Sequence, residues 1–197
     1  IAAVALEDGY GDEFGIIKGE EAYLNINTII KNIDKRFYVD ATNNLVMFTD
    51  ATKTYKTKIG GKTINETENT DYVISFMDGK NCYVNVKFVK KYVDFDYKVV
   101  KAEGKSPARI VLKYTSGEKN QMTVKSNIEM RTKADYQNLI VTTLKKNTKV
   151  TVLEESGDWT KVGTDDGFMG YVPAKKLKDK ETKKTEFKSD ADTYTHV

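Results

Sequence analysis

Histidine and cysteine, the side chains most often used for nucleophilic catalysis and for binding transition metals, each occur once in the chain. His196 is the penultimate residue of a polar tail, and Cys82 lies in the alternating run "NCYVNV", a pattern typical of a half-buried strand. These positions argue against a Ser-His-Asp or Cys-His arrangement, a zinc site and a disulfide framework. The sequence therefore predicts a core thiol at Cys82, no bound metal and no cofactor.

Basic and acidic side chains are nearly balanced, with 32 Lys and Arg against 29 Asp and Glu. The two signs are interspersed, so no long basic stripe is available to follow a phosphate backbone, and nucleic acid is not expected as a partner. No long apolar run occurs, so no membrane span is expected. Because no pair of carboxylates stands out by its spacing, the chain is predicted not to be an enzyme.

The chain's one tryptophan, Trp159, lies between two glycine-containing turns in "GDWTKVGTDDGFMGYVPAKKL" (157–177). Alternate residues of a strand face opposite sides, so if Thr160 and Val162 face a core, Trp159 and Lys161 face away from it. A tryptophan on that face has two interpretations. It covers one open end of a barrel, or it forms a concave binding surface with other aromatic residues.

The binding interpretation needs aromatic side chains from neighbouring turns, together with carboxylates that orient a peptide amine. The candidate ligand-binding residues are Tyr136, Trp159, Phe168, Tyr171, Asp135 and Asp158. As lone carboxylates, Asp135 and Asp158 are also consistent with solvated loop positions. No catalytic or metal-binding residue is assigned, and Asp165-Asp166-Gly167 is interpreted as a hairpin turn.

Two further sets of basic residues have both a structural and a functional interpretation. Arg131 braces the loop that follows it through a carboxylate, or it contacts a ligand. A group of lysines forms a solvated surface, or its members together attract an anionic polymer. These lysines are Lys145, Lys146, Lys175, Lys176 and Lys178.

Two stretches of the chain are similar to each other at an offset of 60 residues: "GEEAYLNINTIIKNIDKRFYV" (19–39) and "GKNCYVNVKFVKKYVDFDYKV" (79–99). In each, a glycine turn precedes a short strand, and Asn25 or Asn85 stands where a helix N-cap belongs. Apolar residues at helical spacing follow, and then two β-like runs. The pattern predicts a strand-helix-strand-strand unit that occurs twice, so the fold class expected for residues 16–119 is α+β.

From about residue 120 the helical spacing disappears, and short β runs alternate with turns. This alternation predicts a small all-β barrel over residues 120–178. Residues 1–15 are interpreted as a leader or linker, and the charged, threonine-rich stretch 179–197 as a linker to a downstream domain. The two domains are expected to fold as separate units.

The second domain resembles the bacterial SH3-like (SH3b) family over residues 124–178. The resemblance lies in "NIEMRTKAD", "LKKNTKVTVLEESGDWTKV" and "GFMGYVPAKKL". It departs from the family pattern at Lys133-Ala134, where a Gly-Pro turn is usual, and at Tyr171, where tryptophan is common. The resemblance implies an SH3-like barrel that recognises cell-wall peptide or glycan.

The first domain resembles the copper amine oxidase N-terminal-like module of Gram-positive surface proteins, through "YVNVKFVKKYVDFDYKVV" and, more faintly, "YLNINTIIKNIDKRFYV". Copper binding is not expected because the domain has no histidine. The resemblance implies a surface stalk or spacer. In such surface proteins these modules often precede a catalytic domain that resembles glycoside hydrolase family 18.

Together these observations predict a non-catalytic, extracellular cell-wall-binding and spacer region of a bacterial surface protein, located at the cell surface or wall. The attached glycoside hydrolase follows from the resemblances alone. The alternative is a protein-interaction or adhesin-like scaffold whose partner is another protein. A hydrolase that acts through this chain is a third hypothesis, for which the sequence offers no nucleophile, base or metal set.

Overall fold

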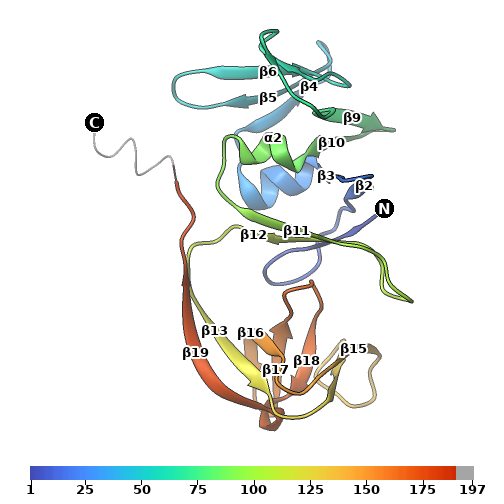
Figure 1. Cartoon of the computed structure of the whole chain (residues 1–197), viewed down its shortest axis with the longest axis vertical. Coiled ribbons are helices and arrows are strands. Elements are labelled where there is room, and N and C mark those ends of the chain that lie inside the picture. Colours follow the sequence, from blue (N-terminus) through green and yellow to red (C-terminus); the bar gives the residue numbers. More distant parts are fainter. Residues whose placement is uncertain (190–197) are drawn as a thin grey trace. The chain divides into compact units, whose positions relative to one another are not determined.

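The computed structural model describes residues 1–189, and the chain divides into two compact units (Figure 1). The first unit consists of Ile1–Val4 and Gly11–Tyr114, together with the end of the described chain from Lys188. The second unit consists of Ala5–Tyr10 and Thr115–Phe187. The second unit therefore begins and ends outside the range 120–178 that the sequence predicted for the second domain.

The first unit is built mostly from short β-strands, and its helices are too short to form a layer. α1 (Ile26–Thr28) has three residues and continues into a π-helical turn, η1 (Ile29–Ile33), while α2 (Val86–Lys90) has five residues. The predicted fold class, α+β with a duplicated strand-helix-strand-strand domain, is therefore wrong, because the chain is mostly β. After α1 the hydrogen bond from Asp34 N reaches back five residues to Ile29 O, which ends α-helical geometry although the apolar spacing continues.

The strands of the first unit form several small sheets. The four-stranded sheet contains β2 (Ile16–Lys18), β3 (Glu21–Asn25), β10 (Asn81–Asn85) and β9 (Ser75–Asp78), in that order. One three-stranded sheet contains β4 (Phe37–Asp40), β5 (Leu45–Thr49) and β6 (Thr54–Lys58). Another contains β1 (Ala3–Ala5), β12 (Arg109–Lys113) and β11 (Asp96–Val100). β7 (Thr63–Ile64) and β8 (Glu68–Asn69) form a separate pair.

Aromatic side chains fill much of the core of the first unit. The ring centroids of Phe37 and Phe48 lie 4.7 Å apart, and Phe48 stacks on Tyr92 at 4.8 Å. Cys82 is only 4% exposed, which confirms the predicted core thiol, and burial raises its pKa to about 11. The thiol is therefore protonated at neutral pH and packs as a small apolar group.

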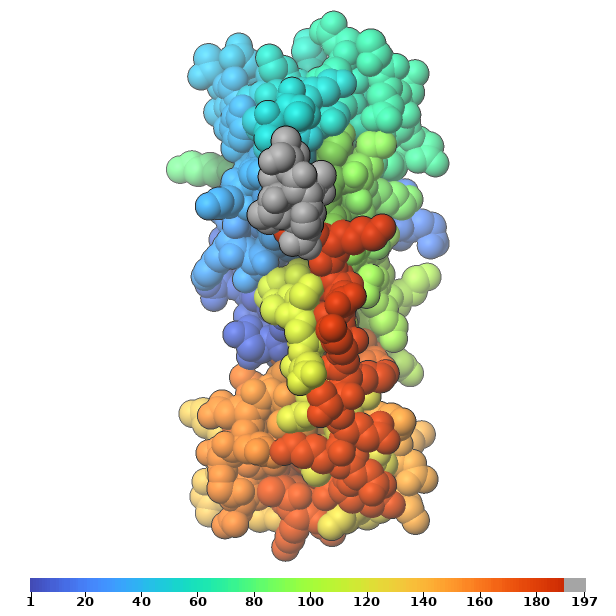
Figure 2. All heavy atoms as spheres, turned by 90° about the vertical axis from the view of Figure 1, so that its left-hand side faces the viewer, coloured from blue at the N-terminus to red at the C-terminus, as the bar shows by residue number. Residues whose placement is uncertain are grey.

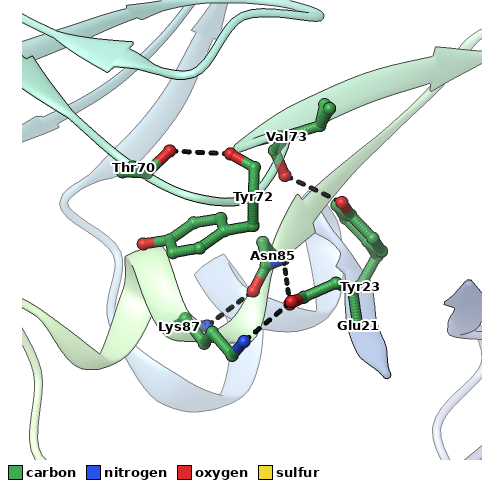
Figure 3. A network of polar contacts seen from close by, with 7 residues as sticks. All are labelled: Glu21, Tyr23, Thr70, Tyr72, Val73, Asn85 and Lys87. Atoms are coloured by element: carbon green, nitrogen blue, oxygen red, sulfur yellow. Dashed lines mark hydrogen bonds and ion pairs between the residues drawn. The ribbon is translucent and has the colours of Figure 1, made fainter. Parts of the chain in front are cut away.

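Two buried asparagines, Asn25 and Asn85, connect the helix starts to the central strand pair. The Oδ1 atom of each accepts a main-chain hydrogen bond at 2.9 Å from the residue two positions later, which confirms the predicted N-caps. The Asn85 amide donates to Glu21 Oε2 at 2.9 Å, as Figure 3 shows, and the Asn25 amide donates to Asn81 Oδ1 at 3.3 Å. Because these asparagines are 0–1% exposed, such pairing offsets the cost of burying their amides.

Glu21 joins the network around Asn85 to the first turn of α2. Its second carboxylate oxygen accepts a hydrogen bond from Lys87 Nζ at 2.7 Å (Figure 3). Burial raises the pKa of Glu21, but the hydrogen bonds from Asn85 and Lys87 and the charge of Lys87 outweigh it, so the pKa lies below its ordinary value of 4.5. The carboxylate is therefore held in its ionised form.

The second unit contains one seven-stranded antiparallel sheet. Its strands in order are β15 (Ile140–Leu144), β14 (Ile128–Arg131), β18 (Met169–Pro173), β17 (Trp159–Gly163), β16 (Lys149–Ser156), β13 (Gly117–Val124) and β19 (Leu177–Thr185). These strands contain the short β runs predicted from the sequence. The core cluster consists of Val124, Met130, Leu144, Val150, Val162, Val172 and Leu177.

Strands β13 and β19 form a long ribbon at one edge of this sheet. They pair from Gly117 with Thr185 to Val124 with Leu177, and Figure 2 shows them side by side in yellow and red. The sequence predicted a linker from residue 179, whereas residues up to Thr185 lie in β19. The prediction failed there because the main-chain ladder, rather than apolar side chains, pairs this charged segment with β13.

Ala5–Tyr10 packs against the second unit, although the sequence placed residues 1–15 in a leader or linker. Tyr10 Oη donates to Gly167 O at 3.0 Å and accepts from Met169 N at 3.2 Å. Lys161 Nζ donates to Asp8 O at 2.9 Å. These polar contacts join residues about 150 positions apart in the sequence, which local patterning does not reveal.

We expect Glu21→Gln to reduce stability in a pH-dependent way. Because the pKa of Glu21 is lowered by folding, its ionised form stabilises the protein above the unfolded pKa, and this contribution is lost as the pH falls through the folded pKa. The variant should be less stable than the parent by about 1 kcal/mol at neutral pH, a small value because the carboxylate is partly solvated. The difference should shrink as the pH falls below about 4.5. Melting curves by circular dichroism at neutral and acidic pH measure it, with the exposed neighbour Glu20→Gln as control.

Tyr10→Phe should destabilise the second unit by about 1 kcal/mol, since it leaves Met169 N–H and Gly167 C=O without this partner. Trp159 lies in the same unit and is the only tryptophan, so its fluorescence during urea unfolding reports that unit selectively. Tyr38→Phe, at a tyrosine that is 43% exposed in the first unit, is the control. Equal urea midpoints for Tyr10→Phe and Tyr38→Phe would contradict a stabilising role of the Tyr10 hydroxyl in the second unit.

Candidate ligand-binding surface

The alternation of β17 decides where Trp159 points. Thr160 and Val162 are 4% and 0% exposed and face the core, so Trp159 and Lys161 face the other side of the strand. This is the arrangement that the sequence predicted. Trp159 pairs with Pro173 of β18 and is half-buried, so part of its indole remains accessible.

Tyr136 brings a second aromatic ring to Trp159 from the loop between β14 and β15. The ring centroids lie 4.8 Å apart at an interplanar angle of 62°, an edge-to-face pair. Tyr136 is 58% exposed. The guanidinium of Arg131 lies 5.8 Å from the centroid of the Tyr136 ring, within the range of a cation–π contact. The loop tyrosine is thus held by one aromatic and one cationic neighbour.

Tyr171 lies on the same face of the sheet as Trp159. It pairs with Lys161 of β17 and with Arg131 of β14, while its neighbour two residues on, Pro173, pairs with Trp159. Tyr171 is therefore the diagonal neighbour of Trp159, and it is half-buried. The structure brings three of the four predicted aromatic residues to one region of the domain.

Phe168 differs from the other three aromatic residues. Its side chain packs against the core cluster. It lies four residues before the buried Val172, so the two side chains point to the same face of the strand. Its N–H donates to Thr164 Oγ1 at 3.0 Å, and its carbonyl accepts from Thr164 N at 2.8 Å. These bonds close the turn that contains Asp165-Asp166-Gly167, where Gly167 has a φ of 86°. The predicted aromatic surface therefore loses Phe168 to the core.

The two candidate carboxylates have different surroundings. Asp135 Oδ1 accepts a hydrogen bond from Gln137 N at 2.8 Å, so this carboxylate shapes the loop that carries Tyr136. Asp158 immediately precedes Trp159, and its exposed carboxylate has no hydrogen bond or ion pair with any residue from 1 to 189. Of the two, Asp158 is the one whose carboxylate is available to a ligand beside the indole.

These residues fall in a segment with a recognisable family pattern. Residues 126–178 match the family model of the bacterial SH3 domain. The match confirms the resemblance seen in the sequence of the second unit. Neither a curated protein nor a solved structure matches the chain significantly. The resemblance of residues 16–119 to the copper amine oxidase N-terminal-like module gains no support from these comparisons.

Arg131 forms the contacts expected of a structural brace, one of the two interpretations that the sequence left open. Its Nη1 donates to Asn138 O at 2.8 Å, and its Nη2 donates to Glu129 Oε2 at 2.6 Å. The first bond closes the loop that carries Tyr136, and the second is a charge-assisted pair along β14. The guanidinium is thus committed to positioning this loop.

Sequence reasoning missed two exposed apolar residues at the base of the same loop. Leu139 is 78% exposed and Ile140 is 50% exposed. Leu139 O accepts a hydrogen bond from Thr132 N at 3.0 Å, which closes the loop, and Ile140 pairs with Arg131. The sequence predicted only that short β runs alternate with turns in this domain. The place of β15 at the edge of the sheet, which leaves one side uncovered, was not visible in the sequence.

The described residues of the two units show no metal centre. No group of three or more His, Cys, Asp or Glu side chains that could hold a metal ion occurs among residues 1–189, and His196 lies outside the described residues. In the same part of the chain, no helix has the length and apolar character needed to cross a membrane.

Alanine substitutions should distinguish the core residue Phe168 from the surface residue Tyr136 by their effects on stability. Phe168→Ala should lower the free energy of unfolding by about 2–3 kcal/mol, because the ring packs on the core. Tyr136→Ala should lower it by no more than about 1 kcal/mol, because more than half of Tyr136 is solvated. Urea unfolding followed by circular dichroism measures both. Similar losses for the two variants would show that Tyr136 is a core residue as well.

Proposed function

We propose that this chain is a non-catalytic binding region in which the SH3 domain recognises cell-wall peptide or glycan. The observation that carries the proposal is the edge-to-face pair of the exposed Tyr136 and the half-buried Trp159 within the match to the bacterial SH3 domain. Tyr171 extends this surface, and Asp158 offers a carboxylate beside it. The first unit serves as a spacer.

The chemistry of the surface suits a ligand that has both apolar and polar parts. Aromatic rings give a large contact area at a small cost in side-chain entropy, which is why Tyr and Trp are frequent in binding sites. Trp159 is fixed by its strand, and Tyr136 is fixed by a loop that Arg131 and Asp135 close. A rigid aromatic surface of this kind supports binding because little order has to be created when the ligand arrives.

A protein partner is the second candidate, and one observation favours it. Leu139 and Ile140 extend an exposed apolar surface next to the loop of Tyr136. Adjacent exposed apolar residues of this size are often covered by another protein. The cell-surface location and the attached glycoside hydrolase rest on sequence resemblance alone and remain predictions.

Binding to purified peptidoglycan sacculi tests the proposed function. Trp159→Ala and Tyr136→Ala should each weaken binding by about thirtyfold, equivalent to about 2 kcal/mol for a central aromatic residue. Tyr38→Ala, at another exposed tyrosine outside the SH3 domain, should bind like the parent. Competition with soluble stem-peptide and glycan fragments identifies which part of the wall is recognised.

Melting temperatures of the same variants show whether a loss of binding reflects loss of the fold. If Trp159→Ala unfolds the second unit but the folded fraction still binds, Trp159 only closes the barrel. If the parent chain does not sediment with sacculi at all, wall recognition is refuted and the protein-partner hypothesis replaces it.

A further inference from the structure

Six lysines lie near one another at one end of the seven-stranded sheet: five on three connections that are distant in sequence, and Lys178 at the start of β19. Backbone hydrogen bonds join these connections: Lys125 N donates to Lys176 O at 2.8 Å, and Asn147 N donates to Val124 O at 2.8 Å. In addition, Lys125 Nζ donates to Lys175 O at 2.9 Å. We call this group the lysine cluster, and it consists of Lys125, Lys145, Lys146, Lys175, Lys176 and Lys178.

The positive charges of the lysine cluster are not neutralised within the described chain. None of the six forms an ion pair with a carboxylate of residues 1–189, and all are exposed except Lys176, which is half-buried. Other lysines of the same unit are paired: Lys149 with Glu181, Lys180 with Glu155 and Lys184 with Glu186. The lysine cluster thus differs from these paired lysines in carrying positive charge without a carboxylate partner.

The connections that carry the lysine cluster lack acidic residues. The three connections read Lys125-Ser126-Asn127, Lys145-Lys146-Asn147-Thr148 and Ala174-Lys175-Lys176, and they contain no Asp or Glu. Asp179 follows the cluster in sequence, and Asp158 O accepts a hydrogen bond from Ala174 N at 2.8 Å. The connections themselves thus carry five lysines and no carboxylate.

We propose that the lysine cluster binds a linear polyanion, a chain of polyols linked by phosphodiesters. This goes beyond the proposed function, because it concerns other residues and another class of ligand. Exposed lysines are flexible point charges, and each contact with a single anion contributes little in water. A polymer with a phosphate on every unit lets several weak contacts act together, and it releases its counterions on binding.

The neighbouring residues favour a polyol phosphate over a nucleic acid. The three connections contain no aromatic side chain on which bases could stack and no arginine that could read a base edge. They do contain Ser126, Asn127, Asn147 and Thr148, neutral groups able to form hydrogen bonds with hydroxyls.

Titration of the full chain with poly(glycerol phosphate) tests the proposal. Neutralising three lysines together (Lys145→Gln, Lys146→Gln and Lys175→Gln) should weaken binding about tenfold or more at low salt. The slope of log K against log salt should become shallower, because fewer counterions are released when fewer lysine–phosphate contacts form. The matched control neutralises three paired lysines, Lys149→Gln, Lys180→Gln and Lys184→Gln, and should change binding much less.

Three results overturn the proposal. The first is equal binding by the cluster variant and the control variant when both melt at the parent temperature. The second is binding of inorganic phosphate alone as tight as that of the polymer. The third is tighter binding of a single-stranded oligonucleotide of equal charge, which would assign the cluster to nucleic acid. Trp159→Ala should bind the polymer like the parent, so a failure of the proposed aromatic site is distinguishable from a failure of this one.

Discussion

The two-residue period of β17 is the constraint on which the candidate surface depends. Burial of Thr160 and Val162 in the core leaves the opposite face of the strand for Trp159. A shift of one residue in register would bury the indole and expose Val162, at a cost of several apolar contacts. The core therefore fixes the tryptophan without any contact to a ligand, and the loop of Tyr136 then closes over one edge of its ring.

The first unit depends on two buried asparagine side chains that each form more than one hydrogen bond. Asn25 and Asn85 each cap a short helix and also donate across the central strand pair, although both are almost completely buried. Helices of three to eight residues are not stable in isolation, so these caps and the packing of the sheets hold them in place. This explains why the helices add so little to the architecture and why the chain is mostly β.

The sequence was informative wherever a local pattern decides the outcome. Alternation predicted the faces of β17 and the burial of Cys82, and residue type predicted the caps at Asn25 and Asn85. The sequence predicted the structure wrongly where pairing between distant segments determines it. The segment 179–185 has the composition of a linker but pairs with β13, and Phe168 turns into the core because of the turn that precedes it. The lengths of the helices were overestimated because the apolar spacing continues after the α-helical hydrogen bonds end.

The aromatic surface and the lysine cluster meet through a short piece of chain. Pro173 pairs with Trp159, and the turn Ala174–Lys176 that follows carries two lysines of the cluster. Lysine charges attract an anionic polymer over about 10 Å at moderate salt, whereas aromatic contacts form only at van der Waals distance. A wall polymer held by the lysines would raise the local concentration of neighbouring wall peptide or glycan at Trp159, and the second contact would then cost less translational entropy. Weak attraction and short-range recognition can therefore act in series on one small domain.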